Sequence, residues 1–140
     1  MARIDDKIEE IRNYLDELSD IMPSSFDLYS SSLEKRLACE RSFEKIVEAM
    51  VSLALLVITT KRMPKPSEDN KAFDILSQEK IISPKLAIKL KEAKGMRNIL
   101  AHEYGQIDDE LVFEAVTEEI TADAEELISS ILKTTETFKY

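Results

Sequence analysis

The sequence predicts an all-α fold, an antiparallel up-and-down four-helix bundle with one additional short helix. Helix breakers are rare, since the 140 residues include two glycines and four prolines. Residues such as Ala, Leu, Glu, Lys and Ile are abundant, which favours helix throughout. Apolar residues recur every three or four positions, and no alternating strand pattern competes with them. We expect a single domain over residues 1–140, a length sufficient to bury a core.

The first helix is expected over residues 2–22. Its apolar residues are spaced four and three apart, as on one face of a packed helix: Ile4, Ile8, Ile11, Leu15, Leu18 and Met22. Pro23 ends it, and Ser24 or Ser25 is a suitable cap for the next helix.

A long helix is expected from about Phe26 or Leu28 to about Thr60. One stripe along it consists of Phe26, Ser30, Leu33, Leu37, Glu40, Glu44, Val47, Val51, Ala54 and Ile58. A second stripe consists of Phe43, Ile46, Met50 and Leu53. Glu40 and Glu44 interrupt the first stripe, so they are either paired with a cation or the helix faces solvent there. The serines at 30–32 could also break this helix early.

Three further helices complete the prediction. Ser67 is expected to cap a short helix near residues 68–78. Ser83-Pro84 starts a helix that ends near Tyr104-Gly105; its seam is Leu86, Leu90, Ala93, Arg97 and Leu100. A last helix follows Asp108-Asp109, with one stripe of Phe113, Val116, Ile120, Ala124, Leu127, Ile131, Thr134 and Phe138.

Charge is distributed unevenly along the chain, whose net charge is −9. Residues 79–104 are the only basic segment, with six basic and three acidic side chains, net +3. This basic segment either holds a phosphate or is a solvated lysine face. Because the protein is acidic overall, it should bind nucleic acid weakly and non-specifically at best. A single cysteine, Cys39, excludes an internal disulfide and fits a reducing compartment. With no signal peptide and no membrane-spanning run, we expect a cytoplasmic protein.

The only histidine, His102, lies in this basic segment, five residues after Arg97 and two before Tyr104. On an ideal helix Arg97 and Tyr104 share a stripe, whereas His102 is turned roughly 140° from Arg97. Either the helix loosens near Gly105, or a second copy of the chain supplies part of the site. Arg97 on an apolar seam needs a carboxylate, a phosphate or a wet cleft, and Glu40 or Glu44 is its expected partner. Gly95 suggests a close helix approach, such as a symmetric dimer.

The chemistry suited to these residues is metal-free phosphodiester chemistry. Histidine transfers protons near neutral pH, arginine stabilises phosphate oxygens bidentately, and RNA supplies its own 2′-hydroxyl nucleophile. No Gly-rich phosphate loop, metal-ligand spacing or Ser-His-Asp pattern is present, so no metal and no cofactor are expected. The alternative for Arg97 and His102 is a structural hydrogen-bonding pair at a helix end.

The run Gly95-Met96-Arg97-Asn98-Ile99-Leu100-Ala101-His102-Glu103-Tyr104-Gly105-Gln106-Ile107-Asp108 carries a family resemblance. It resembles the R-x4-H-x-Y motif and its surroundings in HEPN-domain proteins, specifically the HepT-type toxins of prokaryotes. Phe73-Asp74-Ile75-Leu76 and Ile81-Ile82-Ser83 are also similar, and Glu40-Arg41 and Glu48-Ala49 less specifically so. The resemblance covers roughly residues 2–135.

The resemblance implies a homodimeric, metal-independent endoribonuclease toxin of a type VII-like toxin–antitoxin pair. Its antitoxin would be a minimal nucleotidyltransferase (MNT). In such a protein Arg97 would stabilise the RNA phosphate and His102 would transfer protons in the dimer cleft, with Asn98, Glu40 and Glu44 supporting them. Tyr104 would receive AMP from the antitoxin, and the added negative charge and bulk would block RNA.

Two other functions remain open at this point. The chain could be a catalytically inactive HEPN-like partner that presents a substrate to a minimal nucleotidyltransferase. It could also be a helical dimer in which Arg97 and His102 only tie Glu40 or Glu44 into the interface. Cleavage of RNA by the protein would distinguish the ribonuclease toxin from both of these alternatives.

Overall fold

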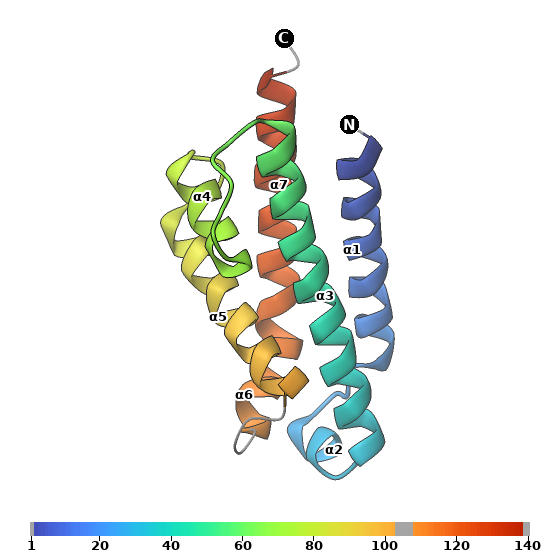
Figure 1. The fold of residues 1–140 in the computed structure, drawn as a ribbon. Coiled ribbons are helices and arrows are strands. Elements are labelled where there is room, and N and C mark those ends of the chain that lie inside the picture. The colour runs from blue at the N-terminus through green and yellow to red at the C-terminus, as the bar shows by residue number, and fades with distance from the viewer. Residues whose placement is uncertain (1, 103–107, 139–140) are drawn as a thin grey trace.

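The computed structural model describes residues 2–102 and 108–138, with side chains described for residues 3–102 and 108–134. Four long helical segments form an antiparallel bundle (Figure 1): α1 (Ala2–Ile21), α3 (Leu33–Thr60), α5 (Pro84–His102) and α7 (Ile120–Phe138). Shorter elements connect them: α2 (Phe26–Ser30), η1 (Asp69–Lys71), α4 (Ala72–Gln78), α6 (Asp109–Glu114) and the π-helical turn η2 (Ala115–Glu119). No described residue is in a strand. The predicted all-α bundle is confirmed.

The bundle is held together by α3, which contacts α1, α4, α5 and α7. Its core face combines both predicted stripes. All four residues of the second, Phe43, Ile46, Met50 and Leu53, are buried, and so are Val47, Val51, Ala54 and Ile58 of the first. The first stripe is wrong at its start: Leu33 and Leu37 are 61% and 54% exposed. These two leucines lie in the first two turns of α3.

The predicted long helix is interrupted at Ser31 and Ser32, as the serines there allowed. The Ser32 side chain accepts a hydrogen bond from the Lys35 backbone N–H and caps α3. Ser25 caps α2 in the same way through Leu28. Serine competes for backbone hydrogen bonds in this manner, which makes it a helix cap rather than a helix interior residue.

A cluster of aromatic rings packs α2 against α6 at one end of the bundle. The Phe113 ring lies 5.7 Å from that of Phe26 and 5.3 Å from that of Tyr29, centroid to centroid. Tyr29 is fully buried, and burial, followed by the charge of nearby Glu40, raises the pKa of its hydroxyl. The cluster fixes the end of the bundle at which α5 also ends (Figure 1).

Helix termini elsewhere follow local chemistry. The Ser83 hydroxyl accepts a hydrogen bond from Leu86 N–H at 3.0 Å, so the predicted start of α5 is confirmed. Ser67 does not cap the short helical segment, since η1 begins at Asp69, after Glu68. A residue with left-handed backbone lies two positions after the end of both α3 and α4, Arg62 (φ 55°) and Lys80 (φ 62°).

The turns after α3 and α4 share one hydrogen-bond pattern. Met63 N–H donates to Ile58 C=O and Arg62 N–H to Thr59 C=O, while Ile81 and Lys80 repeat this with the carbonyls of Leu76 and Ser77. This is the Schellman arrangement, in which two otherwise unpaired carbonyls of the last turn are satisfied. Glycine usually occupies its left-handed position, and neither turn has one.

The last helical segment follows the predicted stripe, with Val116, Ile120, Ala124, Leu127 and Ile131 all buried. It contains the π-helical turn η2, where the Thr117 hydroxyl donates to the Phe113 carbonyl at 2.7 Å. Such turns appear mostly as single insertions within α-helices. None of the described helices is long and apolar enough to span a membrane.

Asp123 on α7 is a buried carboxylate, 7% exposed. Its nearest cation is Lys89 of α5, with Nζ 4.0 Å from Oδ1. Burial raises the pKa of Asp123, an effect that Lys89 opposes. A raised pKa in the folded state means that the charged form of this residue destabilises the fold at neutral pH.

Replacing Asp123 by Asn should therefore raise the midpoint of thermal unfolding at pH 7 by a few degrees. The gain is present above the ordinary pKa of 3.8 and disappears below it, because the carboxyl is then protonated in both states. Calorimetry between pH 3.5 and 7 measures it, with the exposed Glu125→Gln on the same helix as control. A pH-independent difference would contradict the assignment to ionisation.

Candidate functional site: the Arg97 depression between α3 and α5

Arg97 lies on the side of α5 that faces α3, with 22% of its side chain exposed. The neighbours that place it there are Leu90 and Leu100 of the same helix, both buried in the core. Its stem is therefore packed while its guanidinium reaches the surface, as long cationic side chains at a core edge do.

Two side chains hold the Arg97 guanidinium. Its Nη2 forms an ion pair and hydrogen bond with the Glu48 carboxylate of α3. Its Nη1 donates to Oδ1 of Asn98 at 3.2 Å, and Lys94 Nζ donates to the same oxygen at 3.4 Å. Nε is buried and has no hydrogen-bond partner. Ligands from solvent can therefore reach Arg97 only through its two terminal nitrogens.

The predicted partner of Arg97 was wrong by one helical turn. Glu40 lies beside Tyr29 and Cys39, where its charge, second to burial, raises the pKa of the Cys39 thiol. Glu44 is half-buried, and no ion pair to it is found among the described side chains. Glu48 continues the same four-residue spacing, and it is the carboxylate of α3 that pairs with Arg97.

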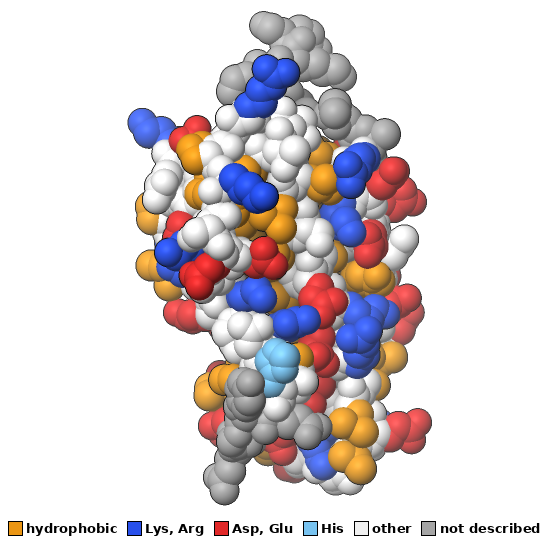
Figure 2. Space-filling view, viewed as in Figure 1, with side chains coloured by type: hydrophobic (Ala, Val, Ile, Leu, Met, Phe, Trp, Pro, Cys, Tyr) orange, Lys and Arg blue, Asp and Glu red, His pale blue; other side chains and the backbone are white. Residues whose placement is uncertain are grey.

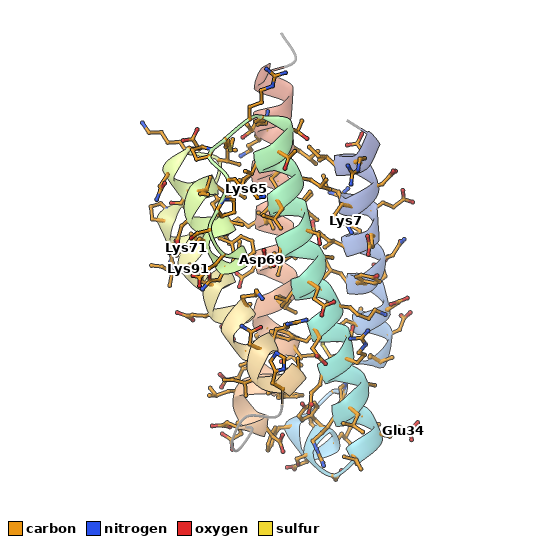
Figure 3. All side chains as sticks on the ribbon, viewed as in Figure 1. Lys7, Glu34, Lys65, Asp69, Lys71 and Lys91 are labelled. Carbon is orange, nitrogen blue, oxygen red and sulfur yellow. The ribbon has the colours of Figure 1, made fainter. Side chains whose placement is uncertain are left out.

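A shallow depression surrounds Arg97 between α3 and α5. Its lining consists of Val47, Glu48, Val51, Ser52, Leu55, Asp69, Lys94 and Arg97. Asp69, labelled in Figure 3, comes from η1, which packs against α3. The depression is thus lined by two cations, two carboxylates, a serine and three apolar side chains.

A second depression lies on the other side of the same exposed ridge of α3, towards α1. It shares Glu48 and Ser52 with the first and is otherwise lined by Lys7, Glu10, Tyr14, Arg41, Lys45 and Ala49. Lys45 is paired with Glu17 at 3.4 Å and lies 4.6 Å above the centre of the Tyr14 ring. Figure 2 shows basic and acidic side chains intermixed as a band across one face of the molecule.

His102 is the last residue of α5 and is exposed. Figure 2 shows the histidine on the same face as the mixed band, next to basic side chains. Because α5 is helical through His102, Arg97 and His102 leave the helix axis roughly 140° apart. Tyr104 lies outside the described residues, as does the expected end of this helix at Tyr104-Gly105.

Gly95 faces open space. A Cβ built on it would meet nothing within 4 Å, so the close helix approach that this glycine suggested is not made inside the described chain. Within the described ranges, no three His, Cys, Asp or Glu side chains cluster so that they could hold a metal ion.

Glu48 and Lys94 are the residues of this site that sequence reasoning missed. Lys94 belongs to the basic segment, but its contact with Asn98 follows only from their i, i+4 spacing on α5. For Glu48 the available signal was the spacing of four residues that continues from Glu40 and Glu44. Each step of four residues turns the position by about 40° around the helix axis, so Glu48 lies about 80° around α3 from Glu40.

Comparison with known proteins agrees with this architecture. A family model described as "Ribonuclease HepT-like" matches residues 4–131. The chain is 33% identical over 114 residues to the "tRNA nuclease HepT" of Aphanizomenon flos-aquae, covering 81% of this chain and 78% of that protein. It is 26% identical over 75 residues to the "mRNA nuclease HepT" of Shewanella oneidensis, covering 54% and 56% respectively.

Among solved structures, the chain resembles the tri-AMPylated HEPN toxin of Shewanella oneidensis in complex with its MNT antitoxin. The TM-score is 0.86 at 21% identity, over 93% of this chain and 96% of that one, which shows a shared fold. The match of the family model over most of the sequence, together with the relative from Aphanizomenon flos-aquae, shows the family. The chain belongs to the HepT-like ribonuclease family.

Proposed function

We propose that this protein is a metal-independent endoribonuclease, the toxin of a HepT/MNT toxin–antitoxin pair. Arg97 and His102 carry the reaction, and Tyr104 is the site at which the antitoxin attaches AMP. The observation that carries the proposal is the Arg97 guanidinium, held by Glu48 and Asn98 at the solvent edge of α5. Two named nuclease relatives in the same family support it.

The proposed reaction needs only groups of the protein and the RNA. A histidine removes the proton from a 2′-hydroxyl, whose oxygen attacks the adjacent phosphorus. The bond from phosphorus to the 5′-oxygen breaks, that oxygen receives a proton from a second histidine, and a 2′,3′-cyclic phosphate remains. Arg97 hydrogen-bonds the non-bridging oxygens, where negative charge accumulates in the transition state.

A homodimer supplies both histidines in this proposal. One chain has a single histidine, and it leaves α5 at a large angle to Arg97. Of the two arrangements that the sequence allowed, regular helix through His102 favours the one in which a second copy completes the site. Exposed Gly95 and Ile99, the latter 44% exposed, leave this outer side of α5 accessible to such a copy.

Silencing by AMP follows from electrostatics. Tyr104 comes two residues after His102, so a phosphate ester on its hydroxyl would add negative charge and bulk beside the histidine. RNA phosphates would then be repelled from the site and sterically excluded.

We expect Arg97→Ala and His102→Ala each to lower RNA cleavage by about 100-fold or more, since each removes a group that acts in the transition state. Cleavage of total RNA by the purified protein in excess EDTA measures this, alongside growth arrest when the protein is produced alone. The control is Lys91→Ala on α5, whose ammonium pairs with Asp74 away from the site. Equal toxicity of parent and alanine variants would show that the site is wrongly assigned.

Arg97→Ala should cost only about 1 kcal/mol of the free energy of unfolding, because the Arg97–Glu48 pair is partly exposed, at 22% and 46%. Leu100→Ala, at a residue 6% exposed on the same helix, should cost about 2–4 kcal/mol. Urea unfolding compares the two. A loss of several kcal/mol for Arg97→Ala would instead favour a purely structural role for the pair.

Purification with and without a co-produced cognate nucleotidyltransferase should give different intact masses. We expect one or more AMP units on Tyr104 only when the partner and ATP are present, and none on Tyr104→Phe. Peptide mapping locates the modification. An unchanged mass, together with no RNA cleavage by the unmodified dimer, would favour the inactive substrate-presenting partner.

A further inference from the structure

The charges that line the Arg97 depression cancel. Lys94 and Arg97 contribute two positive charges, and Glu48 and Asp69 contribute two negative ones. An anion that reaches the terminal nitrogens of Arg97 therefore meets a carboxylate already bound to one of them. Any phosphate bound there lies close to the charge of Glu48.

Glu48 could act on Arg97 as an anchor or through its charge, and these roles have opposite consequences. An anchor would be needed if the guanidinium were otherwise free. The Arg97 side chain is instead mostly buried, its Nε is enclosed, and Nη1 is held by Asn98. Because these constraints remain without Glu48, the charge of the carboxylate is the larger effect.

That charge discriminates between phosphates of different ionisation. The repulsion between Glu48 and a bound anion is proportional to the charge of the anion. At a separation of roughly 6 Å, even with the dielectric constant of water, it weakens binding about threefold per unit charge. A monoanionic phosphodiester thus loses about threefold and a dianionic phosphate monoester about tenfold.

We propose that Glu48 is a specificity-determining residue that weakens the binding of terminal phosphate monoesters at the Arg97 site more than that of internal phosphodiesters. The inference rests on the proposed binding of a phosphate by Arg97. Internal linkages of RNA carry one negative charge, whereas chain ends with a phosphate and mononucleotides carry about two at neutral pH. Lys94 and Arg97 attract the dianion more strongly than the monoanion, and Glu48 offsets part of that advantage of phosphorylated ends.

The test uses two small probes that differ in charge, dimethyl phosphate and methyl phosphate, at pH 8. Titration of the ¹⁵N-labelled full-length protein, followed by the amide resonances of α3 and α5, gives a Kd for each probe. The variants are Glu48→Gln, which removes the charge at nearly constant shape, and Glu44→Gln, which removes the same charge one turn earlier on α3. Arg97→Ala shows whether the probes report this site.

Glu48→Gln should tighten the binding of dimethyl phosphate about threefold and of methyl phosphate about tenfold, so the ratio of the two Kd values should shift about threefold in favour of methyl phosphate. Glu44→Gln should change either Kd by less than twofold, and Arg97→Ala should abolish the binding of both probes.

Three results would overturn the proposal. Weaker binding of both probes to Glu48→Gln would make Glu48 an anchor, and an equal effect on both would deny charge discrimination. Binding that survives Arg97→Ala would place the anion elsewhere. No RNA cleavage enters the measurement, so a chain without nuclease activity can still support this proposal, and an active nuclease can still contradict it.

Discussion

Burial of the apolar face of α3 is the contact on which the position of the site depends. Ile46, Met50, Leu53 and Val57 are fully buried, and the helix that carries them contacts the other three long helical segments. Glu48 belongs to the opposite, exposed side of this helix. Its carboxylate can meet Arg97 only because core packing fixes the rotation of α3 relative to α5. The Arg97–Glu48 pair is therefore a consequence of how the helices pack rather than a cause of the fold.

Elements with unbroken periodicity could be predicted from the sequence, whereas features decided by local hydrogen bonds could be predicted only in part: the Ser83 cap could be, but the break before α3 was only one of two possibilities. The apolar stripes predicted for α1, α5 and the last helical segment mostly match buried positions, because apolar residues recur there at helical spacing on one face. The break before α3 depends on one Ser32 hydroxyl reaching the Lys35 N–H, against a sequence that otherwise continues as helix. Leu33 looks like a core residue until that break places it at an exposed helix start.

The candidate site, too, could be predicted only in part. Arg97 could be singled out because a guanidinium on an apolar seam demands a partner, and the structure supplies one. Which carboxylate supplies it could not be read from spacing, since Glu40, Glu44 and Glu48 lie one turn apart while each step rotates about 40° around α3. Only the packing angle of α3 against α5 decides among them. The predictions for Tyr104 concern a residue outside the described structure.

The acidity of the whole chain bears less on RNA binding than its net charge of −9 suggests. Charges separated by more than about 8 Å are largely screened at physiological ionic strength. The acidic surplus lies in residues 1–20, with three basic and seven acidic side chains, and in residues 105–140, with two basic and ten acidic. The charges that line the depression with Arg97 are Lys94, Asp69 and Glu48. Because these local charges cancel, the binding of a phosphate at Arg97 must come from directed hydrogen bonds rather than from a positive field. The charge of Glu48 alone then has a large effect on which phosphates the proposed site binds.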